Sequence, residues 1–207
     1  MRTLFSTLVA AAIVLPGAAT AAPAGSKSDA DAVERVQILG RCMARSHGGD
    51  IHKLILTDHR SADYRRRIEA LQNKHVRCVL SSGGGNWRSP GLLYVGALAE
   101  GMLHERRLLA NLASLTAYDP NRPAIQANSA GDVMAYCMVR RQPAQVGALL
   151  GTRAATDAEL AALKELGPVL SGCVPANSKS EFTREALRAL IALNAYRLYA
   201  HNGGGAR

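Results

Sequence analysis

Hydrophobic residues recur along this chain every three or four positions, a spacing typical of amphipathic helices. Val36, Leu39 and Met43 follow it in one segment, and Ile68 and Leu71 follow it in a later one. The residues available for a core are mostly alanine and leucine, because the 207 residues include only two phenylalanines and one tryptophan. Aliphatic side chains of this kind suit the packing of helix on helix better than a β-sandwich. The pattern therefore predicts an all-α fold.

Polar residues that can cap a helix predict where the helices begin. The predicted caps are Ser28, Ser61, Ser89, Ser129, Thr156 and Thr183. Thr156 is predicted to form a capping box with Glu159, and Pro90 follows Ser89 at a first helical position. The third helix is therefore expected to start at Ser61 in the first half and at Thr156 in the second half. Leu71 is one of the residues expected to be buried on the third helix of the first half.

Glycine and proline indicate where the helices end. The first predicted helix ends near Gly48 and Gly49, and a short second helix covers residues 51–56. In the second half of the chain the corresponding helix ends before Pro143, and a short helix covers residues 143–150. With a capped third helix and a long fourth helix, each half is predicted to contain four helices.

The four cysteines have a regular spacing. Cys42 and Cys78 are 36 residues apart, Cys137 and Cys173 are also 36 residues apart, and the two pairs are offset by 95 residues. Zinc sites normally use cysteines two to four residues apart, so structural disulfides are favoured over a metal site. Three pairings are possible in an oxidising compartment. A repeat would select Cys42–Cys78 and Cys137–Cys173, with one disulfide in each half.

An internal repeat is supported by further residues at the same offset. Between residues 33 and 105, twelve positions carry the same residue 95 positions later, including Arg45 and Arg140. Identity alone would be weak support in so alanine- and leucine-rich a chain, but the cysteine spacing and the aligned caps strengthen it. We interpret the chain as a tandem duplication of a four-helix unit. The two units are expected to pack through their long fourth helices around a pseudo-two-fold axis.

The N-terminus has the features of a signal peptide. A positive residue, Arg2, precedes a short apolar stretch, and Ala19-Thr20-Ala21 fits the small-x-small cleavage pattern. The apolar stretch is too short for a spanning helix, so no transmembrane segment is expected after cleavage. We predict an exported protein, periplasmic or secreted. The predicted organisation is a signal peptide (1–21), a flexible segment (22–30), repeat unit 1 (31–112), a linker (113–123), repeat unit 2 (124–202) and a tail (203–207).

The chain is basic, with a formal net charge of +9 that becomes +8 when Arg2 is removed with the leader. Outside the cytoplasm such a charge favours an anionic envelope component or an acidic protein as a partner, and nucleic acid is not expected. Arginines on solvated helix faces are the alternative explanation. The sequence gives no oligomeric state.

The sequence gives little support for a catalytic or cofactor-binding site. His104-Glu105 begins like the zinc-protease motif H-E-x-x-H, but Leu108 replaces the second histidine. The Gly83–Gly85 loop lacks the Lys-Ser/Thr of a phosphate-binding loop. Four other histidines cluster in the first half without the i, i+4 spacing of metal ligands, and we interpret them as surface residues: His47, His52, His59 and His75. No catalytic residue, metal site or cofactor is predicted.

Two groups of arginines are candidate contacts for an anion or a partner. Arg65, Arg66 and Arg67 spread charge around one helical turn of the first half only, with Asp63 and Glu69 as possible ion-pair partners. Their alternative role is a solvated helix face.

Arg45 and Arg140 are present in both halves, three residues after the first cysteine of each pair. A structural role is expected for them, such as bonding the carbonyls that end a neighbouring helix. A duplicated anion site is the alternative.

Three functions are therefore open. The first is a non-enzymatic module that contacts another protein or the envelope, which an exposed apolar groove or arginine face would support. The second is a small-ligand-binding protein with a pocket between the two units, which an apolar cavity with one or two paired arginines would support. The third is an enzyme of an unfamiliar helical class, which converging carboxylates or histidines would support.

Overall fold

The computed structural model describes residues 27–74, 76–81, 91–175 and 181–204. Within these ranges every regular element is helical, which confirms the all-α prediction. The α-helices are α1 (Lys27–Leu56), α2 (Ala62–Lys74), α3 (Val76–Ser81), α4 (Gly91–Glu105), α5 (Leu112–Leu115), α6 (Ala130–Arg141), α7 (Pro143–Gly151), α8 (Asp157–Cys173) and α9 (Arg184–His201). A short 3-10 helix, η1 (Leu109–Asn111), precedes α5. The predicted signal peptide, the Gly83–Gly85 loop, His75 and the cap at Ser89 lie outside the described residues.

The predicted break in the first helix is confirmed. Helix α1 spans Lys27–Leu56, but the backbone of His47 is not helical (φ −136°, ψ 29°), so two helical segments meet at a kink there. Ile51 and Leu54 hold the second segment in place, because both are completely buried in the core. In the second half the corresponding break is complete, since Pro143 starts a separate helix, α7.

Four predicted N-caps are confirmed, because the side-chain oxygen of each accepts a hydrogen bond from the backbone N–H three residues later: Ser61, Ser129, Thr156 and Thr183. The predicted capping box at Thr156 differs in one detail. The Glu159 carboxylate accepts from the N–H of Ala155 at 2.9 Å rather than from that of Thr156. Ala155 has a positive φ of 60°, and this turn precedes the helix.

Both predicted disulfides are present. Cys42–Cys78 joins α1 to the short helix α3, and Cys137–Cys173 joins α6 to the last residue of α8. Each closes a loop with a sequence separation of 36 residues. On the loop-entropy model, such a crosslink stabilises the fold by roughly 3–4 kcal/mol.

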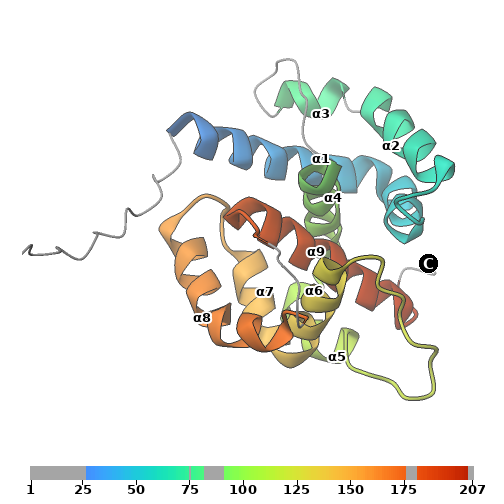
Figure 1. The fold of residues 1–207 in the computed structure, drawn as a ribbon. Helices are drawn as coiled ribbons and strands as arrows, with labels where there is room; N and C mark the ends of the chain where they lie inside the picture. The colour runs from blue at the N-terminus through green and yellow to red at the C-terminus, as the bar shows by residue number, and fades with distance from the viewer. Residues whose placement is uncertain (1–26, 75, 82–90, 176–180, 205–207) are drawn as a thin grey trace, which may run out of the picture.

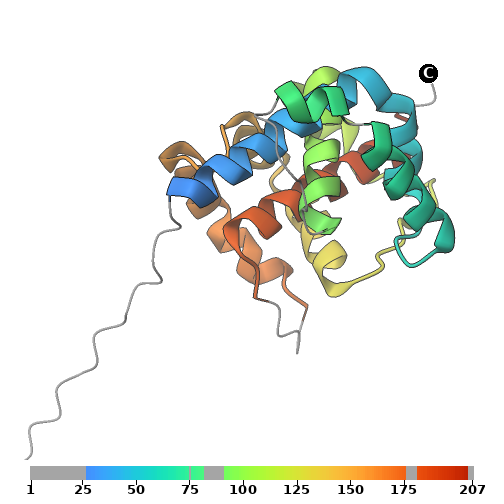
Figure 2. The same ribbon diagram turned by 90° about the horizontal axis from the view of Figure 1, so that it is seen from above.

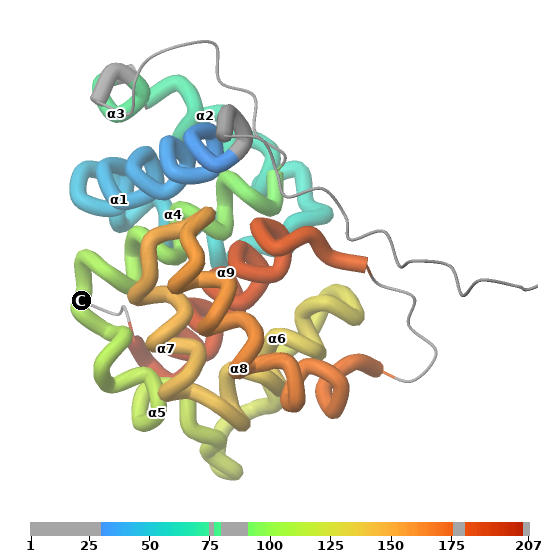
Figure 3. Tube along the Cα trace, turned by 90° about the vertical axis from the view of Figure 1, so that its left-hand side faces the viewer, coloured from blue at the N-terminus to red at the C-terminus, as the bar shows by residue number. Residues whose placement is uncertain are grey.

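Helices α4 and α9 lie between two groups of helices (Figures 1 and 3). Helices α1, α2 and α3 lie on one side of the pair, and α6, α7 and α8 lie on the other. Residues Tyr94–Leu103 of α4 and Arg188–Leu198 of α9 are buried without interruption. A helix buried on all sides is a core helix, and the molecule is built around these two.

Small residues allow the central helices to cross very closely. A Cβ atom added to Gly101 of α4 would lie 2.3 Å from the backbone oxygen of Gly40 in α1. A Cβ atom added to Gly40 would lie 2.2 Å from the backbone oxygen of Ala97. At the crossing of α4 with α9, a Cβ atom on Gly96 would lie 2.4 Å from the Cβ of Ala189. Backbone therefore meets backbone at the α1–α4 crossing, and the view from above in Figure 2 shows how α1, α4 and α9 overlap there.

Hydrogen bonds hold the segment that connects the two halves against the end of α9. The predicted linker over residues 113–123 starts inside α5, and the chain from Thr116 to Ser129 forms no helix. Asn202 donates hydrogen bonds to the backbone oxygens of Leu115 and Ala117, both at 2.9 Å. Arg122 donates to the backbone oxygen of His201 at 2.8 Å. None of the described helices is long and apolar enough to cross a membrane.

Candidate functional site

Two arginines of α9 are buried, and they lie nine residues apart, at Arg188 and Arg197. Nine residues correspond to two and a half helical turns, so the two side chains leave opposite faces of the helix. Arg188 reaches the end of α7, whereas Arg197 reaches the end of α1. Each guanidinium also pairs with a buried carboxylate, so α9 takes part in two separate ionic clusters.

Arg188 lies at the centre of an ionic cluster in which its own side chain is 1% exposed. It donates two hydrogen bonds to the Glu100 carboxylate, at 2.9 and 2.7 Å, and a third to Glu159 at 3.0 Å. It also donates to the backbone oxygens of Leu149 and Thr152, at the C-terminus of α7, at 3.2 and 2.8 Å. The last carbonyls of a helix lack some of their intrahelical partners, and Arg188 bonds two of them here together with the two carboxylates. The Leu149 oxygen also accepts from the N–H and the hydroxyl of Thr152.

The charges of this cluster are balanced. Burial lowers the pKa of Arg188, but the hydrogen bonds and charges of Glu100 and Glu159 outweigh burial and raise the pKa overall. Arg184 forms a second ion pair with Glu159. Two carboxylates and a histidine, His104, do converge here, as an enzyme would require. However, both carboxylates are about 1% exposed and held by arginines, so the arrangement is structural.

His104 borders this cluster, and its surroundings disfavour the charged form of the ring. Its Nε2 lies 2.8 Å from the backbone oxygen of Leu150 and 3.4 Å from Arg41. The shorter contact places the proton on Nε2, because a carbonyl can only accept. Burial and the nearby charge of Arg41 lower the pKa of His104, and Arg188 acts in the same direction. The backbone oxygen of Leu150 and the Glu100 carboxylate at 3.8 Å oppose this only in part.

The lowered pKa of His104 predicts a loss of stability in mild acid. The unfolded chain binds the histidine proton near its ordinary pKa of 6.5, while the folded protein binds it only at lower pH. The free energy of unfolding should therefore fall as the pH decreases through 6.5 and level off below the folded pKa. Urea titrations from pH 7.5 to 5.5 should show a shallower decline for His104→Gln than for the parent. The exposed His59→Gln serves as the control, and an unchanged slope in His104→Gln would contradict the assignment.

The second cluster surrounds Asp132 in the first turn of α6. Its Oδ1 accepts hydrogen bonds from Arg197 at 3.2 Å and from Asn194 at 3.0 Å. Its Oδ2 accepts from the backbone N–H of Asn128 at 3.1 Å. Arg197 itself is 8% exposed and also donates from Nε to the backbone oxygen of Ile55 at 3.1 Å. Both carboxylate oxygens of Asp132 therefore accept hydrogen bonds. Some N–H groups of the Arg197 guanidinium, in contrast, donate to no described residue.

An apolar pocket of about 480 Å³ opens beside this cluster. Its walls come from both halves of the chain, since Leu92 and Val95 belong to α4 while Leu190 and Leu193 belong to α9. The first turn of α6 and the ring of Phe182 complete the walls. The polar residues that line it are His59, Tyr64, Ser129, Asp132 and Arg197. We call this space the inter-half pocket.

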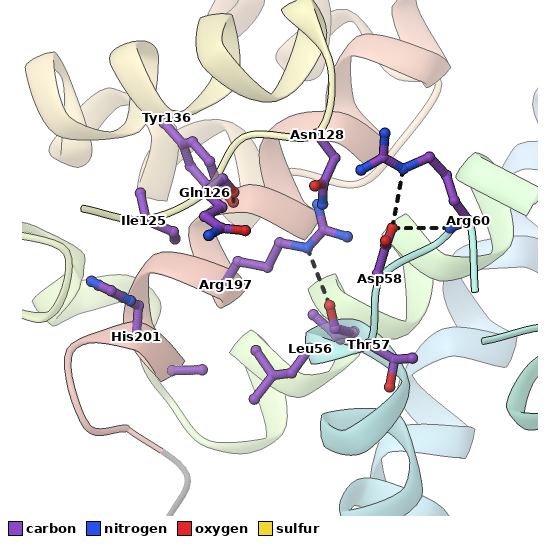
Figure 4. A pocket seen from close by; sticks show the side chains of 12 residues that line it. Leu56, Thr57, Asp58, Arg60, Ile125, Gln126, Asn128, Tyr136, Arg197 and His201 are labelled. Atoms are coloured by element: carbon purple, nitrogen blue, oxygen red, sulfur yellow. Dashed lines mark hydrogen bonds and ion pairs between the residues drawn. The ribbon is translucent and has the colours of Figure 1, made fainter. Parts of the chain in front are cut away.

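A second cavity of about 400 Å³ lies next to Arg197, and Figure 4 shows it from close by. Its lining is more polar, with Arg197, Asn128 and Tyr136 near its middle and an Asp58–Arg60 ion pair of 3.4 Å at one edge. We call it the polar cavity. Arg197 lines both spaces, so its guanidinium can be reached from an apolar side and from a polar side.

The arginines singled out in the sequence lie elsewhere. Arg65 and Arg66 are exposed on α2 and Arg67 is partly buried. Arg66 and Arg67 form ion pairs with Asp63 at 3.1 and 2.7 Å. The structure therefore places them on a helix face where their charge is partly compensated, away from both cavities.

Arg45 and Arg140 do not bond helix-ending carbonyls among the described residues. Arg45 is largely exposed and lies 3.4 Å from Glu105, while the guanidinium of Arg140 lies over the ring of Tyr118 at 5.3 Å. The role predicted for them is filled by Arg188 and Arg197. A partial signal for these two was present, because each is a charged residue in a long helical segment rich in alanine and leucine.

The predicted surface histidines differ among themselves. His52 is partly buried, and its Nδ1 lies 3.1 Å from the hydroxyl of Tyr196, whereas His59 is exposed at the rim of the inter-half pocket. Burial and the charge of Arg106 lower the pKa of His52. In the described ranges, no group of three or more His, Cys, Asp or Glu residues is placed to hold a metal ion.

Comparisons with models of protein families, with curated proteins and with solved structures find no match to this chain.

Proposed function

We propose that this protein binds a small, largely apolar molecule in the inter-half pocket. The observation that carries the proposal is a pocket of about 480 Å³ whose apolar walls come from both halves of the chain. Ligand pockets are typically about 300–1,000 Å³, mostly apolar, and contain a few placed polar groups. Here those groups are the Arg197–Asp132 ion pair at 3.2 Å and the hydroxyl of Tyr64.

A protein- or envelope-contact module has less support. The large apolar residues that are exposed are spread over α1, α6, α8 and the connecting segments: Ile38, Leu56, Tyr118, Val133, Leu160 and Val174. A docking surface would gather such residues in one patch. The Arg65–Arg67 segment has Asp63 as a counter-ion, so it does not form a purely cationic face.

We propose further that the two halves derive from a tandem duplication, with the pocket formed where they meet. Helices α2 and α8 begin at Ala62 and Asp157, which are 95 positions apart. The two carbonyls bonded by the α9 arginines, those of Ile55 and Leu150, are also 95 positions apart. The two disulfides support the proposal that the protein acts outside the cytoplasm, as an exported protein.

A neutral fluorescent probe, N-phenyl-1-naphthylamine, tests the binding proposal. We expect saturable binding at one site per chain, with fluorescence enhancement in the apolar pocket. Gly91 lines the pocket, and a Cβ atom added there meets no atom within 4 Å, so the backbone accommodates a side chain at this position and Gly91→Phe should occupy part of the space. It should weaken probe binding by at least about tenfold.

Gly167 provides the matched control. It is an exposed helical glycine of α8 whose added Cβ also meets nothing within 4 Å, and it does not line the pocket. Gly167→Phe should bind the probe as the parent does. Equal binding by the two variants, or no saturable binding by the parent, would rule out the proposed site.

A further inference from the structure

We infer that the molecule bound in the inter-half pocket is an amphipathic carboxylate whose head group contacts Arg197. The inference rests on the proposed function and adds the chemical class of the ligand. The observation behind it is made where the pocket meets the Arg197–Asp132 pair. There the carboxylate oxygens of Asp132 accept hydrogen bonds, whereas some N–H groups of Arg197 have no acceptor among the described residues.

Both oxygens of the Asp132 carboxylate are engaged, and the neighbouring Oδ1 of Asn194, which is buried without a partner among the described residues, does not line the pocket. The Asp132 carboxylate receives hydrogen bonds from Arg197, from Asn194 and from the backbone N–H of Asn128. Asp132 also lies in the first turn of α6, where the helix dipole stabilises a negative charge. Its charge is therefore compensated by more than one partner, and little of it is left for a cationic ligand.

Arg197, in contrast, has N–H donors that no described residue accepts. A guanidinium has five N–H groups. Arg197 gives one to the backbone oxygen of Ile55 and one to Asp132, and it also interacts with the hydroxyl of Tyr136. No other described residue accepts from it. Burial raises the pKa of Tyr64 despite the nearby charge of Arg197, so the Tyr64 hydroxyl keeps its proton and can donate as well.

A ligand must therefore supply acceptor atoms. A carboxylate matches a guanidinium best, because its two oxygens can receive two parallel N–H groups and the bonds are charge-assisted. The remainder of the ligand would lie among Leu92, Val95, Leu190 and Leu193, which are apolar. Arg197 is 8% exposed, so such an ion pair would be shielded from most of the solvent.

Displacement of the same naphthylamine probe from the full-length protein tests this class. The competitors are decanoate, decanol and decylammonium, which share a ten-carbon chain and differ only in the head group. Decanoate should displace the probe at a concentration at least about tenfold lower than either of the others. Equal displacement by the three, or preference for decylammonium, would overturn the inference while leaving the binding site itself intact. Failure of the probe to bind would instead reject the proposed function.

A paired substitution tests the role of Arg197. Removing Arg197 alone would leave Asp132 buried without its counter-ion, so the test uses Asp132→Asn together with Arg197→Gln. The double variant should still bind the probe and should lose the preference for decanoate. Retention of the preference would overturn the assignment.

An NMR measurement on the parent protein tests the contact without any variant. The side-chain Nε–H resonance of Arg197 should shift when decanoate is added and should not shift with decanol. A resonance that decanoate leaves unchanged would count against the contact.

Discussion

Arg188→Ala should cause the largest loss of stability of any single substitution in the ionic clusters. The change leaves Glu100 and Glu159 without this counter-ion at positions that are about 1% exposed, and it frees the carbonyls at the end of α7. Breaking a buried ion pair from one side costs about 3–5 kcal/mol. Small domains have about 5–15 kcal/mol of stability in total, so this loss is a large fraction of it and the urea midpoint should fall markedly. Urea denaturation followed by far-UV circular dichroism measures the change.

Two further variants separate charge from geometry. Arg188→Lys keeps the positive charge and loses the planar fork, so its stability should lie between those of the parent and the alanine variant. Arg66→Ala removes an exposed arginine that is also paired with a carboxylate, and it should leave the unfolding curve nearly unchanged. If Arg188→Ala unfolds at the same urea concentration as Arg66→Ala, the cluster does not stabilise the fold.

Gly101→Ala should be the second disruptive change, although alanine favours helices. Its Cβ would lie 2.3 Å from the backbone oxygen and 2.6 Å from the backbone carbon of Gly40, so α1 and α4 would have to separate. Overpacking of a core costs about 1–3 kcal/mol, and a backbone contact cannot relax as a flexible side chain does. This cost exceeds the gain of about 0.5–1 kcal/mol from replacing a helical glycine.

Gly49→Ala gives the opposite expectation at another helical glycine, in α1. Gly49 is exposed and its added Cβ meets nothing within 4 Å, so the gain in helix propensity should dominate. Thermal unfolding should therefore shift downward for Gly101→Ala and upward for Gly49→Ala. If neither variant shifts downward, the α1–α4 crossing can accept a Cβ atom.

The parts of the fold that could be predicted from the sequence are those that depend on neighbours along the chain. Helix periodicity and the caps at Ser129, Thr156 and Thr183 use residues within one or two turns, and these predictions are confirmed. The disulfide pairing followed from equal cysteine spacing. The break near Gly48 and Gly49 is also confirmed, as the kink at His47, and the weak helix propensity of glycine is likewise a local property.

The candidate site could not be predicted, because its partners are far apart in the sequence. Arg188 and Glu100 are 88 residues apart, and Arg197 and Ile55 are 142 residues apart. The sequence does contain a partial signal, since Glu100 is a charged residue flanked on both sides by apolar residues and glycine. Such a residue indicates a buried partner without identifying it. Arg65–Arg67 were predicted as a candidate anion or partner contact because they form a run of charges. A solvated helix face normally contains such charges, and two of these arginines form ion pairs with Asp63.

The placement of the disulfides also affects how the chain can refold. Each crosslink joins residues of the same half, and neither connects one half to the other. An unfolded but oxidised chain therefore keeps one closed loop in each half, and the entropy of closing those loops has already been lost. Helices α4 and α9 lie outside both closed loops, so their mutual contacts, which are distant in sequence, form without a covalent constraint. Refolding of the oxidised protein must therefore bring the two halves together by non-covalent packing alone.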